Sequence, residues 1–151
     1  MQISGPRTLT SSKNFTLHTL RLNILSIPYD VLMLTHPSIL LRIEEAALLL
    51  LTIFLYQHLH YSWILFAILF LAPDLFMFGF LMNPRTGAAT YNLVHTLWLP
   101  IALLFAGYLL HWHSAPAIAL IWIAHIAIDR LLGFGLKYPT FFKDTHLQHI
   151  P

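Results

Sequence analysis

The sequence predicts an all-α protein: a four-helix transmembrane bundle with both termini on the cytoplasmic side. Its 151 residues are 58% hydrophobic and only 9% charged, whereas a soluble domain carries about a quarter charged residues. Four apolar segments each approach the ~20 residues that a helix needs to cross the hydrocarbon core. Lys and Arg gather in the parts of the chain that four spans would place on one side of a membrane.

Short polar links separate the apolar segments, and Pro116 in the last link suits the first turn of a helix. Such short links predict antiparallel neighbours. Pro73 and Pro100 fall inside predicted spans, where each should kink its helix and free backbone carbonyl groups. The predicted spans are 39–59, 62–82, 87–110 and 115–136.

The basic residues predict the orientation. Arg85 lies in the second link, further cations flank the four spans at both ends, and the first and third links contain neither Lys nor Arg. The positive-inside rule then places both termini in the cytoplasm. We therefore expect a multi-pass protein of the inner or plasma membrane, with lipids as partners and no nucleic acid; a homo-oligomer is left open.

Three regions differ in character. Residues 1–38 form a lead-in that is rich in Ser and Thr and has one acid among its cations. It resembles a targeting peptide, which would move the protein to an organelle membrane. An interfacial amphipathic segment or an upstream start codon explains it as well, and we favour these two readings together. Residues 39–147 form the four-span domain, and residues 148–151 form a short tail.

The polar residues inside the spans lie at a common depth. A carboxylate or Arg near a span centre costs ~2.5–3.5 kcal/mol on insertion scales, whereas a Leu or Phe returns only ~0.3–0.6 kcal/mol, so these residues should face one another or water. With 1.5 Å of rise per residue, we expect them roughly 8–12 Å below the inner surface, with His125 one turn deeper. The candidate metal ligands among them are Glu44, Asp74, His95, His125 and Asp129.

The spacing of these residues suits coordination. His125 and Asp129 are four residues apart and share a helix face, as do Asn92 and His95, which are three apart. Carboxylates and His-containing pairs from different helices are typical of metal sites in bundle cores. Imidazole and carboxylate ligands suit zinc, iron or manganese, and the chain has no cysteine for a thiolate site. We predict a divalent metal of undetermined identity.

Further polar residues are candidates for catalysis. We expect Arg42 and Arg130 to hold an anionic group or to stabilise developing negative charge, and His146 to shuttle protons after the C-terminal segment folds back. Supporting positions are Tyr91, Asn92, Lys137 and Asp144. The alternative for the whole layer is a buried ion network, in which the arginines neutralise Glu44, Glu45, Asp74 and Asp129 without chemistry.

Two His-x-His motifs stand at the other ends of the spans: His58 with His60, and His111 with His113. They either bind a second metal or, as we favour, are polar residues in the aromatic belt of the interface, because Tyr and Trp lie beside them.

Four stretches resemble the domain of unknown function 4260 family, a group of small bacterial membrane proteins without an assigned activity. They are LRIEEAALLL, LAPDLFMFGFL, TGAATYNLVHT and AHIAIDRLLGFGLKYPTFFKDTHL, and the resemblance covers about residues 39–147. A fainter similarity is to the membrane-bound metal-dependent hydrolases. The matching positions are Asp74, His95, His125 and Asp129. This similarity implies a divalent metal and a hydrolase acting on lipid-linked or phosphorylated substrates.

These observations predict a membrane metal-dependent enzyme, most simply a hydrolase acting on a lipid-like or membrane-embedded substrate. One alternative is a proton or cation transport subunit that uses the same residues. A proton path should reach both faces of the membrane, but the charged residues stop on one side, which favours the enzyme. An iron-dependent membrane oxidoreductase would also use these residues, and a structural partner protein would use them only to fix the packing of its helices.

Overall fold

The computed structural model describes residues 36–150, and every regular element among them is a helix. The all-α prediction is therefore confirmed for these residues, while nearly all of the predicted lead-in lies outside them. One isolated antiparallel bridge joins Lys137 and Thr145. The elements are α2 (Pro37–His58), α3 (Trp63–Leu69), the 3-10 helix η3 (Ala72–Leu81), α4 (Pro84–Val94), α5 (Trp98–Leu109), α6 (Ala115–Leu132) and the 3-10 helix η4 (His146–His149).

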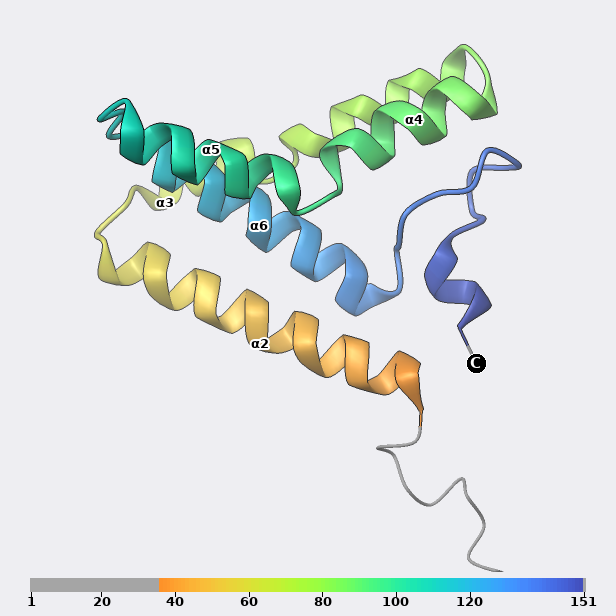
Figure 1. Ribbon diagram of the computed structural model, residues 1–151, viewed down its shortest axis with the longest axis horizontal. Helices are drawn as coiled ribbons and strands as arrows, with labels where there is room; N and C mark the ends of the chain where they lie inside the picture. The colour runs from red at the N-terminus through yellow and green to blue at the C-terminus, as the bar shows by residue number, and fades with distance from the viewer. Residues whose placement is uncertain (1–35, 151) are drawn as a thin grey trace, which may run out of the picture. The chain divides into compact units, whose positions relative to one another are not determined.

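Helix α6 is the centre of the fold. It packs against α2 on one side and α5 on the other (Figure 1), and it contributes most of the buried core. Helices η3 and α4 pack closely against each other, because Gly79 and Gly87 have no side chains to hold them apart. A Cβ atom on Gly87 would overlap the ring of Phe80.

Two helical segments are long and apolar enough to cross a membrane, Trp63–Leu81 and Ala115–Leu132. Helices α4 and α5 provide a third if they are counted as one span, bent by 41° at the break between them. Large apolar side chains such as Leu50, Ile64 and Phe105 are exposed. Such exposure is expected where lipid replaces water.

Helix α2 has the length of a span, but it contains three charged residues, Arg42, Glu44 and Glu45. The face that it turns toward the core includes the buried Thr52 and Tyr56. Glu45 lies on this face because it precedes Thr52 by seven residues, about two helical turns. Glu44 is rotated by about 100° from Glu45 and is exposed.

Both prolines inside predicted spans coincide with a change of helix. Proline has no N–H group to donate to the carbonyl four residues earlier, and its ring clashes with that carbonyl. For Pro73 that residue is Leu69, where α3 ends before the 3-10 turns of η3 begin. For Pro100 it is Thr96, within the break between α4 and α5. The second and third predicted spans are therefore each two helices.

Side chains satisfy carbonyl groups that the second break leaves without helical partners. The indole Nε1 of Trp122 donates to the Val94 carbonyl (2.6 Å), and the Arg130 guanidinium donates to the His95 carbonyl (3.3 Å). Both donors lie on α6. Interrupted helices are tolerated inside membranes when neighbouring helices provide such partners.

Candidate metal site

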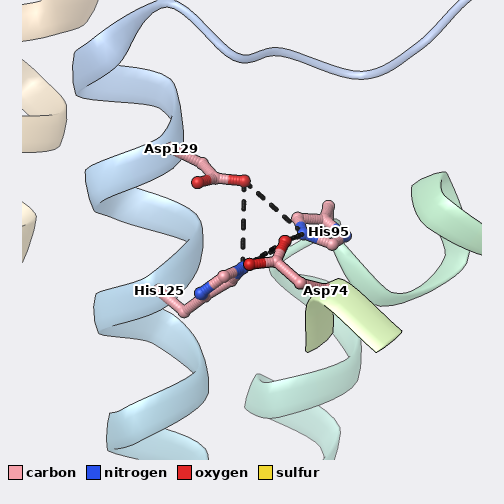
Figure 2. A group of neighbouring side chains, drawn as sticks. All are labelled: Asp74, His95, His125 and Asp129. Carbon is pink, nitrogen blue, oxygen red and sulfur yellow. Dashed lines mark hydrogen bonds and ion pairs between the residues drawn. The ribbon is translucent and has the colours of Figure 1, made fainter. Parts of the chain in front are cut away.

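Four of the predicted ligands meet in the interior (Figure 2). Asp74 lies in the first turn of η3, directly after Pro73, and His95 follows the last residue of α4. His125 and Asp129 lie one turn apart on α6. One ligand atom from each of the four residues lies within 4.8 Å of all the others. Two interrupted helices and one continuous helix therefore build the group.

The distances within the group suit a small cation. His95 Nε2 lies 3.2 Å from His125 Nε2, and the N–O distances from the two imidazoles to Asp74 and Asp129 run from 3.5 to 3.8 Å. A tetrahedral zinc ion with bonds of about 2.0–2.1 Å has ligand atoms about 3.3–3.4 Å apart. The N–O distances are longer than ordinary hydrogen bonds, so the imidazoles do not satisfy the carboxylates directly.

The hydrogen bond of His95 Nδ1 determines which form of its ring the site contains. Nδ1 lies 2.9 Å from the Tyr91 carbonyl oxygen, which can only accept, so Nδ1 carries the proton. A neutral His95 then presents the lone pair of Nε2 to the other three residues. Metal-binding histidines commonly donate their second N–H to a carbonyl in this way.

Two buried atoms of the group have no hydrogen-bond partner, Asp74 Oδ1 and His125 Nδ1. Asp74 Oδ1 is also the atom that approaches both imidazoles. A buried carboxylate oxygen without a partner is costly. A cation between the ligand atoms would offset that cost, so the residues fit a divalent metal.

A second layer of side chains holds the ligands. The Tyr91 hydroxyl donates to Asp129 Oδ2 (3.0 Å), and the Tyr91 ring stacks on His95 with centroids 3.6 Å apart. The Phe70 ring packs edge-on against His125 at 5.4 Å. Such contacts fix the orientation of metal ligands, and they give the predicted supporting residue Tyr91 a defined contact.

Helix α2 reaches the site indirectly. Arg130 pairs with Glu45 at 3.0 Å and uses its other terminal nitrogen on the His95 carbonyl. Glu45 is therefore linked through Arg130 to the backbone of a candidate ligand. The second carboxylate oxygen of Glu45 is buried without a partner.

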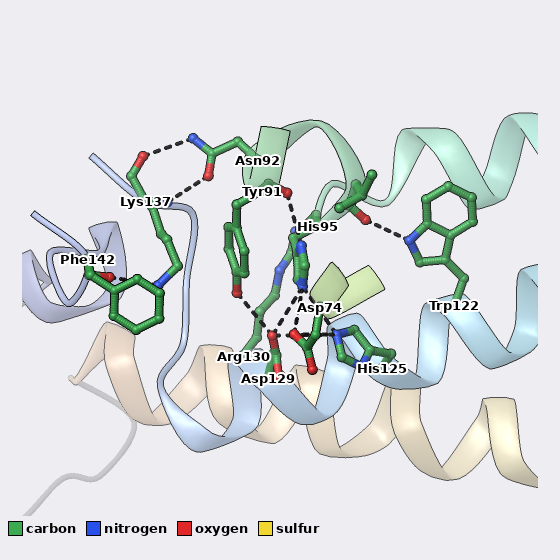
Figure 3. Close-up of polar contacts among 11 residues, drawn as sticks. Asp74, Tyr91, Asn92, His95, Trp122, His125, Asp129, Arg130, Lys137 and Phe142 are labelled. Atoms are coloured by element: carbon green, nitrogen blue, oxygen red, sulfur yellow. Dashed lines mark hydrogen bonds and ion pairs between the residues drawn. The ribbon is translucent and has the colours of Figure 1, made fainter. Parts of the chain in front are cut away.

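The chain after α6 turns back to the site. Gly133 ends α6 in the left-handed conformation (φ 94°), which glycine adopts without strain. Asn92 then holds Lys137, because its side chain accepts from the Lys137 N–H (2.7 Å) and donates to the Lys137 carbonyl (2.9 Å). Figure 3 shows this contact beside Tyr91. The supporting residue Asn92 therefore anchors the C-terminal segment.

A cavity of about 620 Å³ adjoins the ligand group. Asp74, Asp129 and Tyr91 line one part of it, and residues of the C-terminal segment line another. The two carboxylate side chains are 31% and 17% exposed, whereas the two imidazoles are nearly inaccessible. The carboxylate edge of the group is therefore the edge that faces the cavity.

Lys137 is the buried cation of this cavity. It is 7% exposed, and its Nζ donates to the Phe142 carbonyl (2.7 Å) and lies 3.9 Å from the centre of the Phe142 ring. The rings of Tyr91 and Phe80 lie further away, at 4.7 and 5.6 Å. Burial lowers the pKa of Lys137, although the carboxylates of Asp129 and Asp74 act in the opposite direction.

Asp144 organises the turn that follows. It accepts hydrogen bonds from the Thr140 hydroxyl and from His149 Nε2, the latter at 2.6 Å. These two contacts lower the pKa of the Asp144 carboxyl group. The supporting residue Asp144 thus shapes the C-terminal segment and does not line the described cavity next to the ligands.

The remaining predicted residues lie elsewhere. Glu44 is exposed on α2 and is not in the ligand group. Arg42, Arg130 and His146 line a second cavity of about 90 Å³. His146 Nδ1 accepts from the Leu136 N–H at 2.8 Å. The three predicted catalytic side chains therefore gather at a place separate from the cavity that the ligand carboxylates line.

Our sequence reasoning did not single out several residues of the larger cavity, including Met77, Phe134, Thr145 and Gln148. Thr145 is 1% exposed, and its hydroxyl has no hydrogen-bond partner. The sequence gives little indication of Thr145, because it lies outside the periodic helical segments. Its position in the Thr-His-Leu stretch after Phe141 and Phe142 is the only pattern that includes it.

The fold and the site define a helical protein with membrane-like spans and a possible metal-ligand cluster in its interior. The family model for a domain of unknown function (DUF4260) matches residues 38–150, and the chain belongs to this family. No curated protein matches the chain. No solved structure matches it either. The similarity to metal-dependent hydrolases therefore stays a prediction.

Proposed function

We propose that this protein is a four-span membrane enzyme with cytoplasmic termini, in which Asp74, His95, His125 and Asp129 hold one divalent metal ion. The observation that carries the proposal is the convergence of these four side chains beside a cavity. Glu44 is left out because it lies on the exposed side of α2. The reaction that we favour is hydrolysis of an ester, amide or phosphoryl bond in a lipid-like substrate.

A divalent metal here would polarise the bond under attack and lower the pKa of a bound water molecule. The residues of the chain contribute position and charge. Tyr91 holds Asp129 through its hydroxyl group. Lys137 places a positive charge beside the cavity, where it would stabilise negative charge that develops on a substrate oxygen.

A structural metal is the second candidate, because four protein ligands in a tetrahedron are typical of closed, structural zinc sites. Such an ion would lock η3 and the α4–α5 break onto α6. The exposure of the two carboxylates to the cavity favours the catalytic site, because a substrate could reach a metal held by these residues from the cavity.

The test is elemental analysis of the purified protein together with His125→Ala and Asp129→Asn, and with His113→Ala as an exposed histidine control. We expect about one metal ion per chain in the wild type and the control, and loss of that ion in both site variants. Fluorogenic lipid esters and lipid phosphates would then be assayed for metal-dependent hydrolysis.

Two results would overturn the proposal. If folded wild-type protein binds no divalent metal, the proposed metal centre does not exist. Proton flux in liposomes would then support the transport alternative. Bound metal without hydrolysis of either substrate class, and with a lower melting temperature after chelation, would assign the ion a structural role.

A further inference from the structure

The positive charge of Lys137 has no carboxylate partner at ion-pair distance among the described residues. Two carboxylates and one divalent cation would be neutral together, which leaves the Lys137 charge uncompensated. Its contacts are a carbonyl oxygen and aromatic rings. These contacts stabilise an ammonium group only partly, and a buried charge without a counter-ion is costly.

The Thr145 hydroxyl gives a second, independent indication. Thr145 is one of the residues that line the same cavity, and its hydroxyl group is buried and makes no hydrogen bond within the described part of the chain. Buried hydroxyl groups normally have partners. The bridge between Lys137 and Thr145 places their backbones side by side. A residue with a positive charge and a residue with an unused hydroxyl group are therefore neighbours in the wall of the cavity.

The rest of the lining is divided by polarity. Lys143 and Gln148 add a second cation and an amide near the outside, whereas Met77, Phe134 and Phe142 supply apolar walls. The lining suits a ligand with anionic oxygens and a hydrocarbon chain. Basic and hydroxyl donors bind phosphate and carboxylate oxygens through charge-assisted hydrogen bonds.

We propose that Lys137 and Thr145 form a subsite for the anionic oxygens of an amphiphile, a phosphate or carboxylate group carried on a hydrocarbon chain. The cavity lining and the Thr145 hydroxyl group support the subsite on geometry alone, whereas the missing counter-charge of Lys137 and the statement that the ligand is the substrate rest on the proposed function. The anion would lie in the cavity that Asp74 and Asp129 also line, so that the reacting bond can face the metal ligands.

The experiment measures binding of radiolabelled dodecyl phosphate to the full-length protein in an uncharged detergent. Unlabelled dodecyl phosphate, dodecanol and inorganic phosphate serve as competitors. The variants are Lys137→Met, Thr145→Val and the control Arg85→Met, which removes an exposed cation outside the cavity. Thr145→Val keeps the side-chain shape and removes only the hydroxyl group.

We expect Lys137→Met to weaken binding about tenfold or more and Thr145→Val to weaken it about three- to tenfold, because each removes a hydrogen bond to a charged group. Arg85→Met should bind as the wild type does. Thr145→Val should melt no lower than the wild type, since its hydroxyl group has no partner to lose. Folding and binding are thereby separated even if Lys137→Met does not fold.

Unchanged binding in folded Thr145→Val and Lys137→Met would overturn the subsite. Equal competition by inorganic phosphate and dodecyl phosphate would overturn the assignment to an amphiphile. Equal competition by dodecanol and dodecyl phosphate would overturn the assignment to an anion. Repeating the assay with Asp129→Asn separates the two proposals, because this variant should lose the metal ion and keep Lys137 and Thr145. Dodecyl phosphate binding in a wild type without metal would support the subsite and overturn the enzyme, whereas bound metal without dodecyl phosphate binding would overturn the subsite alone.

Discussion

His95 and His125 are buried with their Nε2 atoms 3.2 Å apart, whereas His60 and His111 are exposed in the turns between α2 and α3 and between α5 and α6. Figure 1 shows both turns on the same side of the molecule. The first two are separated by thirty residues of sequence and meet. The other two belong to His-x-His motifs, whose short spacing resembles a ligand pair in the sequence. The described residues nevertheless contain a single group of potential ligands, and neither motif contributes to it.

The backbone explains the difference. His60 and His111 have φ values of 57° and 52°, the left-handed region. Each follows the last turn of a helix, and the next residue donates its N–H back to a carbonyl five residues earlier: Tyr61 to Tyr56 at 3.3 Å, and Trp112 to Gly107 at 2.8 Å. This is the Schellman arrangement, in which glycine is usual. These histidines occupy turn positions, whereas His95 lies at a helix break that directs it inward.

The largest effect should come from exchanging the two kinds of histidine for alanine. We expect His95→Ala to lower zinc affinity by about a hundredfold or more, because a ligand is removed. His111→Ala should leave zinc affinity unchanged. Competition with a chromophoric chelator measures both affinities, and equal losses in the two variants would show that the contrast is wrong.

A smaller effect should follow from the link between α2 and His95. Glu45→Gln leaves the Arg130 charge without its partner in a largely buried position, which should lower the free energy of unfolding by about 2 kcal/mol. Zinc affinity should fall about tenfold, because Arg130 holds the His95 carbonyl. Glu44→Gln is the matched control. Thermal unfolding in detergent and the chelator assay would show whether the adjacent glutamates differ as their exposure predicts.

The smallest effect should come from the turn histidines. We expect His60→Gly and His111→Gly each to raise the free energy of unfolding by about 0.5–1 kcal/mol, because glycine adopts positive φ without the strain of a side chain. Zinc binding should not change. A fall in stability in both variants would mean that the imidazoles make stabilising contacts, and the assignment to turn geometry would be wrong.

Much of the local structure was predictable. The apolar segments indicated helices, and Pro73 and Pro100 indicated where two of them are interrupted. The i, i+4 spacing placed His125 and Asp129 on one face of α6. The four-helix bundle and its orientation stay predictions, because the structure provides two or three segments that are long and apolar enough to cross a membrane.

The choice between Glu44 and Glu45 was not predictable. Adjacent residues on a helix differ by about 100° in direction, and only the packing of α2 on α6 selects the face that Glu45 shares with Thr52. His146 is a similar case. Its ring contacts the backbone at Gly135 and Leu136, and the course of the chain after Gly133 decides that position.

Composition and helical periodicity were enough to establish that the chain is helical and membrane-like and that its interior contains acids and imidazoles. Composition and periodicity suffice for these conclusions because the apolar interior of the membrane and the period of the helix act on each segment separately. The meeting of Asp74 and His95 with the α6 pair, and the placing of Lys137 beside Thr145, depended on tertiary structure. The first requires segments far apart in the sequence to come together, and the helix breaks and the packing around α6 bring them there. The second requires the chain after α6 to turn back on itself between two residues that are eight positions apart.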